Sequence, residues 1–303
     1  MASDNVTEGG AAATSPTQPS TSAPRVRKPD FRMIIRNGCR SNDIAEVSKG
    51  FELAASKGEK NQALLSWALA RAVDFGHVDM ARYLIEQEDA PLDTVSPFIV
   101  AHNPSTEMFQ VLVDHGWDIN QNSRDHGVGQ GKCLLQHICH DESLVRWCLD
   151  HGAKVEGMYT DPYESPPILD MVACRGMIST FELLRSRGAQ LGPRTLHRAV
   201  DGASSGGGIR MAMVKYLVDD LGLDVNTLDT EEKLPDHWGT PLCYAARWHV
   251  GHEAVVRFLL ERGADPSIKD IYGNHDAFSL AGFRKNHAVV EVLQEWKENH
   301  QGE

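Results

Sequence analysis

Glycine residues that recur at a nearly constant interval limit the folds open to this chain more than any other feature. Gly116, Gly152, Gly188, Gly222 and Gly263 each follow an apolar segment ending in Leu or Val, and they lie 36, 36, 34 and 41 residues apart. An interval of about 33 residues is the length that one β-turn and two short antiparallel helices require. The spacing therefore predicts a helical array built from one repeated unit.

The sequence between residues 239 and 266 indicates how one such unit folds. Pro241 follows a Thr and can open a helix, because its missing N–H would be unpaired at that position anyway. Ala245 and Ala246 are small, so the helix of the next unit can approach closely. Gly251 ends the first helix in a left-handed conformation, and the apolar residues at 255, 256 and 258–260 form the stripe of the second.

These residues resemble the ankyrin repeat, whose signature is Gly-x-Thr-Pro-Leu-His-x-Ala-Ala, then Gly-His, then Leu-Leu-x-x-Gly-Ala-Asp. Cys243 stands in place of the signature His, and Trp248 and His249 look like two inserted residues. Looser matches occur at 196–199, at 76–85 and at 288–290, and residues 39–44 resemble a capping first repeat. The resemblance implies an all-α ankyrin-repeat solenoid of about eight helix-turn-helix units with β-hairpin-like loops.

The domain boundaries follow from the composition. Residues 1–29 are rich in Ala, Ser, Thr, Pro and Gly, which predicts a disordered tail. Residues 30–300 then form the solenoid, and its last helix becomes polar from Trp296 onward, as an uncovered terminal repeat requires. The basic residues Arg25, Arg27 and Lys28 at the end of the tail are either a solvated segment or a nuclear-import or docking signal.

Charge and cysteine usage exclude several classes of function. The formal net charge is −12, so the broad basic surface needed for direct nucleic-acid binding is not expected. The six cysteines form no Cys-x-x-Cys pair, which predicts reduced, buried thiols in a cytoplasmic or nuclear protein. No apolar run reaches the roughly 18–20 residues of a membrane span, and the N-terminus is not of signal-peptide type.

Three short patterns resemble motifs of catalytic, anion-binding or metal-binding sites. The residues from Gly202 to Gly206 fit the G-x-S-x-G pattern of a hydrolase nucleophile, but the preceding segment is a predicted helix rather than the strand that this motif needs. The glycines before residue 209 are compatible with an anion site or a simple turn. Cys133 and His137 share a helix face, as a metal pair would, but no converging ligands are evident. We expect no metal, cofactor or catalytic residue.

The resemblance to ankyrin repeats also implies where a partner binds, namely at the hairpin tips and the exposed end of each first helix. At those positions the sequence has Phe75, His102, Tyr163, Arg175, Arg198, Trp238, Arg247, Trp248, Tyr272, Phe283 and Arg284. Trp, Tyr and Arg, which dominate binding hot spots, are concentrated toward the C-terminal end. The long hairpins at 121–131 and 227–238 are further candidates, since insertions in such arrays often lie on the binding face.

The sequence therefore predicts a protein–protein interaction module, an adaptor or scaffold that is monomeric by itself. A regulator that binds a transcription factor or another signalling protein is one form of this function, by analogy with the family. Two alternatives are an enzyme built on the array with a site at the 201–210 loop, and a passive structural subunit of a larger assembly.

Overall fold

A computed structural model describes residues 30–123, 132–155, 167–203, 208–229 and 238–300, and within these ranges the chain forms eight successive helix pairs. The first helices of the pairs are α1 (Phe31–Ser41), α3 (Gln62–Asp74), α5 (Pro97–Val100), α7 (Leu134–Ile138), α9 (Ile168–Arg175), α11 (Thr195–Ala203), α13 (Pro241–Ala246) and α15 (Ala277–Arg284). The second helices are α2 (Ile44–Ser56), α4 (Val78–Glu86), α6 (Thr106–Asp114), α8 (Glu142–Asp150), α10 (Ile178–Ser186), α12 (Gly208–Lys215) with its π-helical continuation η2 (Tyr216–Asp220), α14 (Glu253–Glu261) and α16 (His287–His300).

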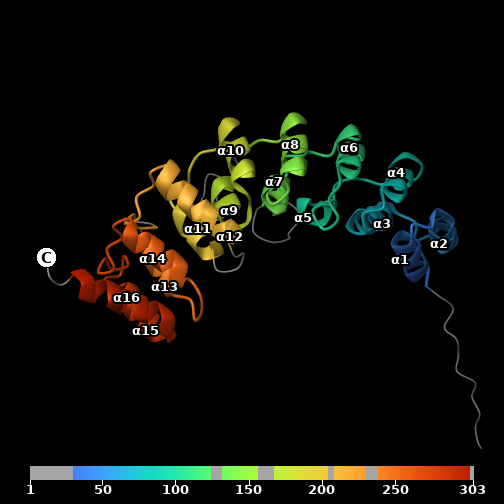
Figure 1. The fold of residues 1–303 in the computed structure, drawn as a ribbon. Coiled ribbons are helices and arrows are strands. Elements are labelled where there is room, and N and C mark those ends of the chain that lie inside the picture. Colours follow the sequence, from blue (N-terminus) through green and yellow to red (C-terminus); the bar gives the residue numbers. More distant parts are fainter. Residues whose placement is uncertain (1–29, 124–131, 156–166, 204–207, 230–237, 301–303) are drawn as a thin grey trace, which may run out of the picture.

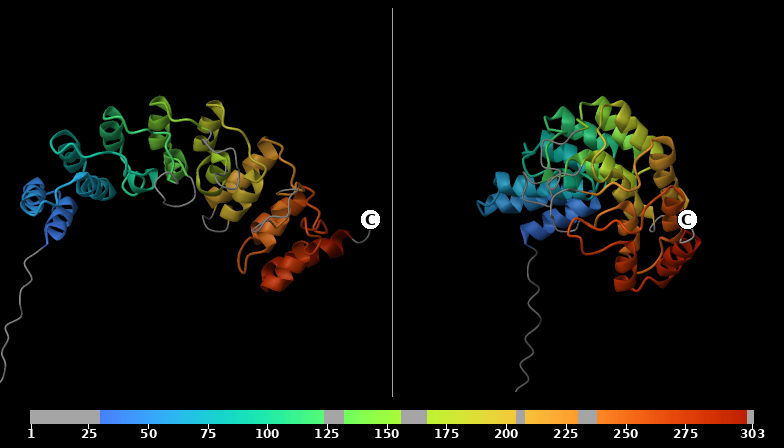
Figure 2. Two further views of the ribbon diagram at one scale, coloured as in Figure 1. Left: turned by 180° about the vertical axis from the view of Figure 1, so that it is seen from behind. Right: turned by 90° about the vertical axis from the view of Figure 1, so that its left-hand side faces the viewer.

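The helices form two layers along a curved array. Each first helix contacts the first helix of the next pair, from α1 and α3 through to α13 and α15. The second helices also pack on one another, as in α4 with α6, α8 with α10 and α14 with α16. Figures 1 and 2 show that the first helices line the concave side, so we call them the inner helices and the second helices the outer helices. The predicted all-α repeat solenoid is confirmed.

Helix starts follow the expected capping chemistry. In α13 the Thr240 side chain accepts a hydrogen bond from the backbone N–H of Cys243, and Pro241 occupies the first helical turn. Ser96, Ser105 and Asp141 cap α5, α6 and α8 in the same way. Each cap satisfies a backbone N–H group that the helix itself leaves unpaired. The role predicted for Pro241 is confirmed.

The recurring glycines end the outer helices in a left-handed conformation. Gly116 has φ of 91° and Gly263 has φ of 84°, and a Cβ built at either glycine meets no atom within 4 Å. The backbone conformation, rather than a lack of space, therefore requires glycine at these two positions. The other three glycines of the series, Gly152, Gly188 and Gly222, also have positive φ.

Asparagine side chains connect successive hairpins. Asn120 donates from its Nδ2 to the carbonyl oxygen of Gly152 and accepts from the backbone N–H of Lys154. Asn226 makes the same two contacts with Gly263 and Asp265, at 2.9 and 2.8 Å. The hairpin regions thus have a repeated side-chain bridge, although the described residues include only one antiparallel β-bridge, between Asn122 and Cys133, and no continuous strand.

Small residues allow the inner helices to approach closely. Ala245, Ala246 and Ala281 are fully buried between neighbouring repeats. At Gly202, near the end of α11, an added Cβ would overlap the backbone carbonyl of Cys174 on α9. The close packing of α11 on α9 therefore requires glycine at position 202. This requirement gives the first glycine of the G-x-S-x-G pattern a structural explanation. Ser204 to Gly207 lie outside the described residues, as do the predicted tail at 1–29 and Tyr163.

No helix in the described part of the chain is long and apolar enough to cross a membrane.

All six cysteines are free thiols, and Cys39, Cys139, Cys148 and Cys243 are buried. Burial raises the pKa of the Cys39 thiol to about 12, so this side chain behaves as a small apolar residue.

The close approach at Gly202 leads to a stability prediction with a matched control. Gly202→Ala should lower the free energy of unfolding by about 1–3 kcal/mol, because α11 would have to move away from α9. Gly282→Ala lies at a similar place in α15, where nothing is within 4 Å of the new Cβ, and should be neutral or stabilising by about 0.5–1 kcal/mol. Urea denaturation followed by circular dichroism measures both, and equal effects would contradict the packing argument.

Candidate partner-binding surface

The predicted binding residues Phe75 and His102 lie at the ends of α3 and α5, and His102 contacts the neighbour of Phe75. His102 lies with its Nδ1 2.6 Å from a carboxylate oxygen of Asp74, and Asn103 donates to the Asp74 carbonyl at 2.6 Å. Phe75, the neighbour of Asp74, is half-buried. The exposed ring of Phe98 packs edge-on against His102, with the ring centroids 4.5 Å apart. Phe98 was missed in the sequence because the short helix α5 belongs to the poorest repeat.

A second group assembles around Trp238 near the C-terminal end. The guanidinium carbon of Arg247 lies 5.5 Å from the centroid of the Trp238 indole, and that of Arg284 lies 5.4 Å from it. Arg247 is also 4.7 Å from the ring of Trp248 and 5.1 Å from that of Tyr244. Guanidinium groups this close to aromatic faces are attracted by the ring quadrupole. The structure therefore brings together four predicted residues that come from two consecutive repeats.

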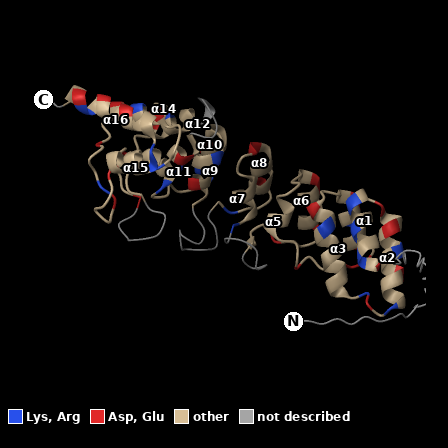
Figure 3. Cartoon of the chain, turned by 90° about the horizontal axis from the view of Figure 1, so that it is seen from below, with Lys and Arg blue, Asp and Glu red and all other residues tan. Residues whose placement is uncertain are grey.

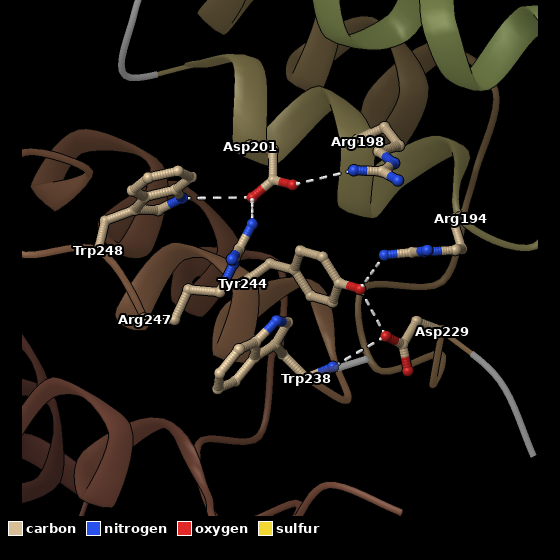
Figure 4. A network of polar contacts seen from close by, with 8 residues as sticks. All are labelled: Arg194, Arg198, Asp201, Asp229, Trp238, Tyr244, Arg247 and Trp248. Atoms are coloured by element: carbon tan, nitrogen blue, oxygen red, sulfur yellow. Dashed lines mark hydrogen bonds and ion pairs between the residues drawn. The ribbon is translucent and has the colours of Figure 1, made fainter. Parts of the chain in front are cut away.

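Asp201, which sequence reasoning did not single out, connects this group to α11. Its carboxylate accepts from Arg247 at 2.7 Å and from the Trp248 indole N–H at 3.2 Å, and it lies 3.6 Å from Arg198. Figure 4 shows these contacts converging on one side chain. The Asp201 side chain is only 8% exposed, and Arg247 is 20% exposed, so this ion pair is shielded from water. Arg247 therefore stabilises the contact between repeats as well as lining the surface.

A buried polar network lies next to the aromatic group. The Tyr244 hydroxyl donates to Asp229 at 2.6 Å and accepts from Arg194 at 2.6 Å. The same Asp229 oxygen accepts from the backbone N–H of Trp238, and the Asp229 N–H donates to the Gly239 carbonyl. Burial and the nearby Asp229 charge raise the pKa of Tyr244, so the phenol stays protonated and able to donate. The network fixes the backbone on both sides of residues 230–237 (Figure 4).

The remaining predicted residues lie at the edge of this group or apart from it. Phe283 is 73% exposed and lies next to Arg284, and its ring is 5.6 Å from that guanidinium carbon. Arg175 is exposed at the end of α9, and Tyr272 is exposed in the last hairpin. Val250, which is 79% exposed in the turn after α13, was not predicted because an isolated apolar residue in a turn has no sequence signal.

Two turns on this surface are joined by hydrogen bonds. Asn286 donates to the carbonyl oxygens of Trp248 and Gly251 at 3.0 and 3.2 Å. The ring of His249 lies 2.9 Å from the carbonyl oxygen of Arg284. The turn at 248–251 is therefore held against the turn at 284–286 of the next repeat, which places Val250 and Phe283 on neighbouring segments.

The contact between Ser123 and His137 does not have the arrangement of an activated nucleophile. Ser123 Oγ lies 3.1 Å from His137 Nε2, but it also lies 3.0 Å from the carbonyl oxygen of Lys132. A carbonyl can only accept, so the hydroxyl proton points to Lys132 and the ring nitrogen acts as the donor. Burial lowers the pKa of His137 to about 4, and the ring stays neutral. Among the described residues, no three His, Cys, Asp or Glu side chains converge as metal ligands.

Comparison with known proteins identifies the repeat. Residues 239–271 match the ankyrin repeat family model. Among solved structures, the chain is similar to the human ASB11 ankyrin repeat domain, with 19% sequence identity, a TM-score of 0.46, and coverage of 86% of this chain and 96% of that one. No curated protein sequence matches the chain. The helical repeat solenoid described above therefore has an ankyrin repeat at 239–271, as the sequence resemblance predicted.

The buried network predicts that the Tyr244 hydroxyl matters for stability. Tyr244→Phe should lower the free energy of unfolding by about 1–3 kcal/mol, because Asp229 and Arg194 each lose a buried hydrogen bond. Tyr216→Phe is the matched control, since its hydroxyl accepts one long hydrogen bond of 3.3 Å from the half-exposed Arg185. Its effect should stay within about 0.5 kcal/mol. Thermal or urea denaturation measures the change in unfolding free energy of each variant. An unchanged unfolding free energy in Tyr244→Phe would mean that the network contributes no stability.

Buried His197 predicts a loss of stability in acid. Its Nε2 lies 3.0 Å from the Thr227 carbonyl, and burial lowers its pKa from 6.5 to about 4. Between these values the unfolded chain binds a proton that the folded chain does not, so stability is full above pH about 6.5 and falls as the pH drops toward 4. The loss from this group is about 3 kcal/mol.

A variant pair tests the sign of this dependence. His197→Asn should flatten the fall in unfolding free energy between pH 6.5 and 4, measured by urea denaturation. Asp170→Asn should steepen it, because burial raises the pKa of Asp170 to about 6 and so makes its folded form gain stability on acidification. The same change of slope in both variants would contradict these assignments.

Proposed function

We propose that this chain is an adaptor or scaffold that binds another protein through the concave C-terminal half of the array. Ankyrin repeats are in general protein–protein interaction modules, and residues 239–271 are one of them. The observation that supports this location is a surface group of aromatic and apolar side chains, Trp248, Val250 and Phe283, held on two turns joined by Asn286. Large exposed apolar side chains on a rigid support are typical of binding hot spots.

The finer form of the proposal is a regulatory role. An extended solenoid surface can hold a signalling protein or a transcription factor without chemistry of its own, and the predicted cytoplasmic or nuclear location fits such a partner. No observation within the described residues favours the alternative of an enzyme at the 201–210 loop, where Gly202 serves helix packing.

Affinity capture with a surface variant tests the proposed function. Val250→Ser with Phe283→Ser should remove captured proteins from a lysate of the source cells, since the loss of one such anchor costs about 2 kcal/mol of binding or more. The helical melt should stay unchanged, because both side chains are largely in solvent. Met33→Ser, at a 56% exposed position on α1 at the other end of the array, is the control.

The outcome separates the proposed function from its alternatives. Specific proteins lost from the double variant, but retained by Met33→Ser, would support an adaptor with this binding surface. If the parent and both variants capture the same proteins, Val250 and Phe283 do not belong to the binding surface. If the parent elutes from a lysate only within one large complex of fixed size, the chain is a structural subunit instead.

A further inference from the structure

Arginine residues recur on the inner helices of the last four repeats, and these helices lie on the concave side of the array (Figures 1 and 2). The inner helices α9, α11, α13 and α15 have Arg175, Arg198, Arg247 and Arg284 on or directly after them. Seen from below in Figure 3, blue segments lie along α9 and α11 and next to α15, with red segments among them at α9 and α11. The whole chain has a formal net charge of −12, so this local concentration of cations runs against the overall charge. The ends of α3 and α5 differ, since Asp74 and His102 occupy them.

Internal ion pairs neutralise only part of this charge. Asp201 is the carboxylate that contacts the group, and it pairs with Arg198 and Arg247. Arg284 lies against the rings of Trp238 and Phe283, and neither it nor Arg175 has a carboxylate within ion-pair distance among the described residues. Among the described residues, Arg198 and Arg247 thus share one carboxylate, whereas Arg175 and Arg284 pair with none.

Lys132 lies near two of these arginines and adds to the local positive charge. Lys132, at the start of the fourth inner helix, is half-buried, and burial together with the charges of Arg175 and Arg198 lowers its pKa. Lys132 is thus close enough to Arg175 and Arg198, on the next two repeats, to be repelled by both. Such a cluster is stabilised when anionic groups bind to it.

The geometry of the arginines suits carboxylates. Arg247 lies against three aromatic rings, and Arg284 lies against two. Rings cover the faces of these two guanidinium groups, and Nη2 of Arg247 already binds Asp201. The exposed Arg175 has its edge N–H groups available, and these match a carboxylate in a planar, bidentate arrangement. Trp248 and Phe283 add exposed apolar surface next to the cations.

From this arrangement we infer that the C-terminal concave surface binds an acidic peptide segment, rich in Asp or Glu and extended along the repeats from α9 to α15. The inference rests on the proposed function and names the chemistry of its partner. A nucleic acid is a poorer fit, because four arginines offer few phosphate contacts while the rest of the chain repels a polyanion.

A peptide titration tests the inference with the intact chain. The probe is a short fluorescein-labelled peptide of alternating Glu and Gly, and a peptide of the same length with Gln in place of Glu is the neutral control. Fluorescence anisotropy should show binding of the Glu peptide that weakens as salt is raised, and no binding of the Gln peptide. Arg175→Gln and Arg284→Gln should each weaken binding, and together by about tenfold or more.

A cation elsewhere provides the matched control. Arg82→Gln removes a half-exposed arginine from the outer helix α4, where Arg82 pairs with Glu86, and should leave the affinity unchanged. Circular dichroism checks that every variant keeps the parent fold, and Arg175→Gln remains informative if the half-buried Arg284 proves necessary for folding.

Three results would overturn the inference. Equal binding of the Glu and Gln peptides would exclude charge recognition, and an unchanged affinity of the folded double arginine variant would place the site elsewhere. Tighter binding of a labelled single-stranded oligonucleotide than of the Glu peptide at the same salt would identify a nucleic-acid surface. If capture depends on Val250 and Phe283 but no Glu peptide binds, the adaptor function stands and only the acidic partner is excluded.

Discussion

Each helix pair buries its apolar residues against the pair or pairs next to it in the array. Ala245 and Ala246 are covered by the next inner helix, and α11 approaches α9 so closely that Gly202 has no room for a side chain. In such an array the stability is a sum of local contributions and of interfaces between neighbours. The polar contacts described above depend on this stacking, because Asp201, Tyr244 and Arg284 belong to three different repeats.

The C-terminal half shows how stacking makes a surface from distant residues. Arg194 and Tyr244 are 50 residues apart in sequence, yet they share a half-buried hydrogen bond, and the same Tyr244 hydroxyl also binds Asp229. Trp238 is fixed by that network and in turn lies against Arg247 and Arg284. The arginines are therefore held in place before any partner arrives, and a preorganised surface loses less conformational entropy on binding.

The sequence was sufficient to predict the repeat length, the start of α13 at Pro241, the glycines that end the outer helices and the small residues between repeats, because each of these depends on the local backbone. The prediction that Gly251 ends the first helix of its unit was wrong, since α13 stops at Ala246. It also placed Trp238, Arg247, Trp248 and Arg284 among the surface positions. It did not indicate that Arg247 pairs with Asp201, or that Tyr244 joins Asp229 to Arg194. Those contacts depend on side-chain rotamers and on the exact offset between repeats, and a spacing of about 33 residues does not define either. Phe98 and Val250 were missed because neither belongs to a periodic pattern.

The asparagine bridges between hairpins determine which segments of such a chain can vary in sequence and length. Asn120 and Asn226 tie their hairpins to the next repeat through residues that come just before the two long insertions. Asp229 then closes the second insertion against Trp238. The contacts that fix the register thus involve the ends of the insertions, so the length and sequence between those ends can vary while Asn120, Asn226, Asp229 and Trp238 keep the repeats in register. A solenoid of this design can acquire new recognition segments, by evolution or by grafting, while its scaffold stays the same.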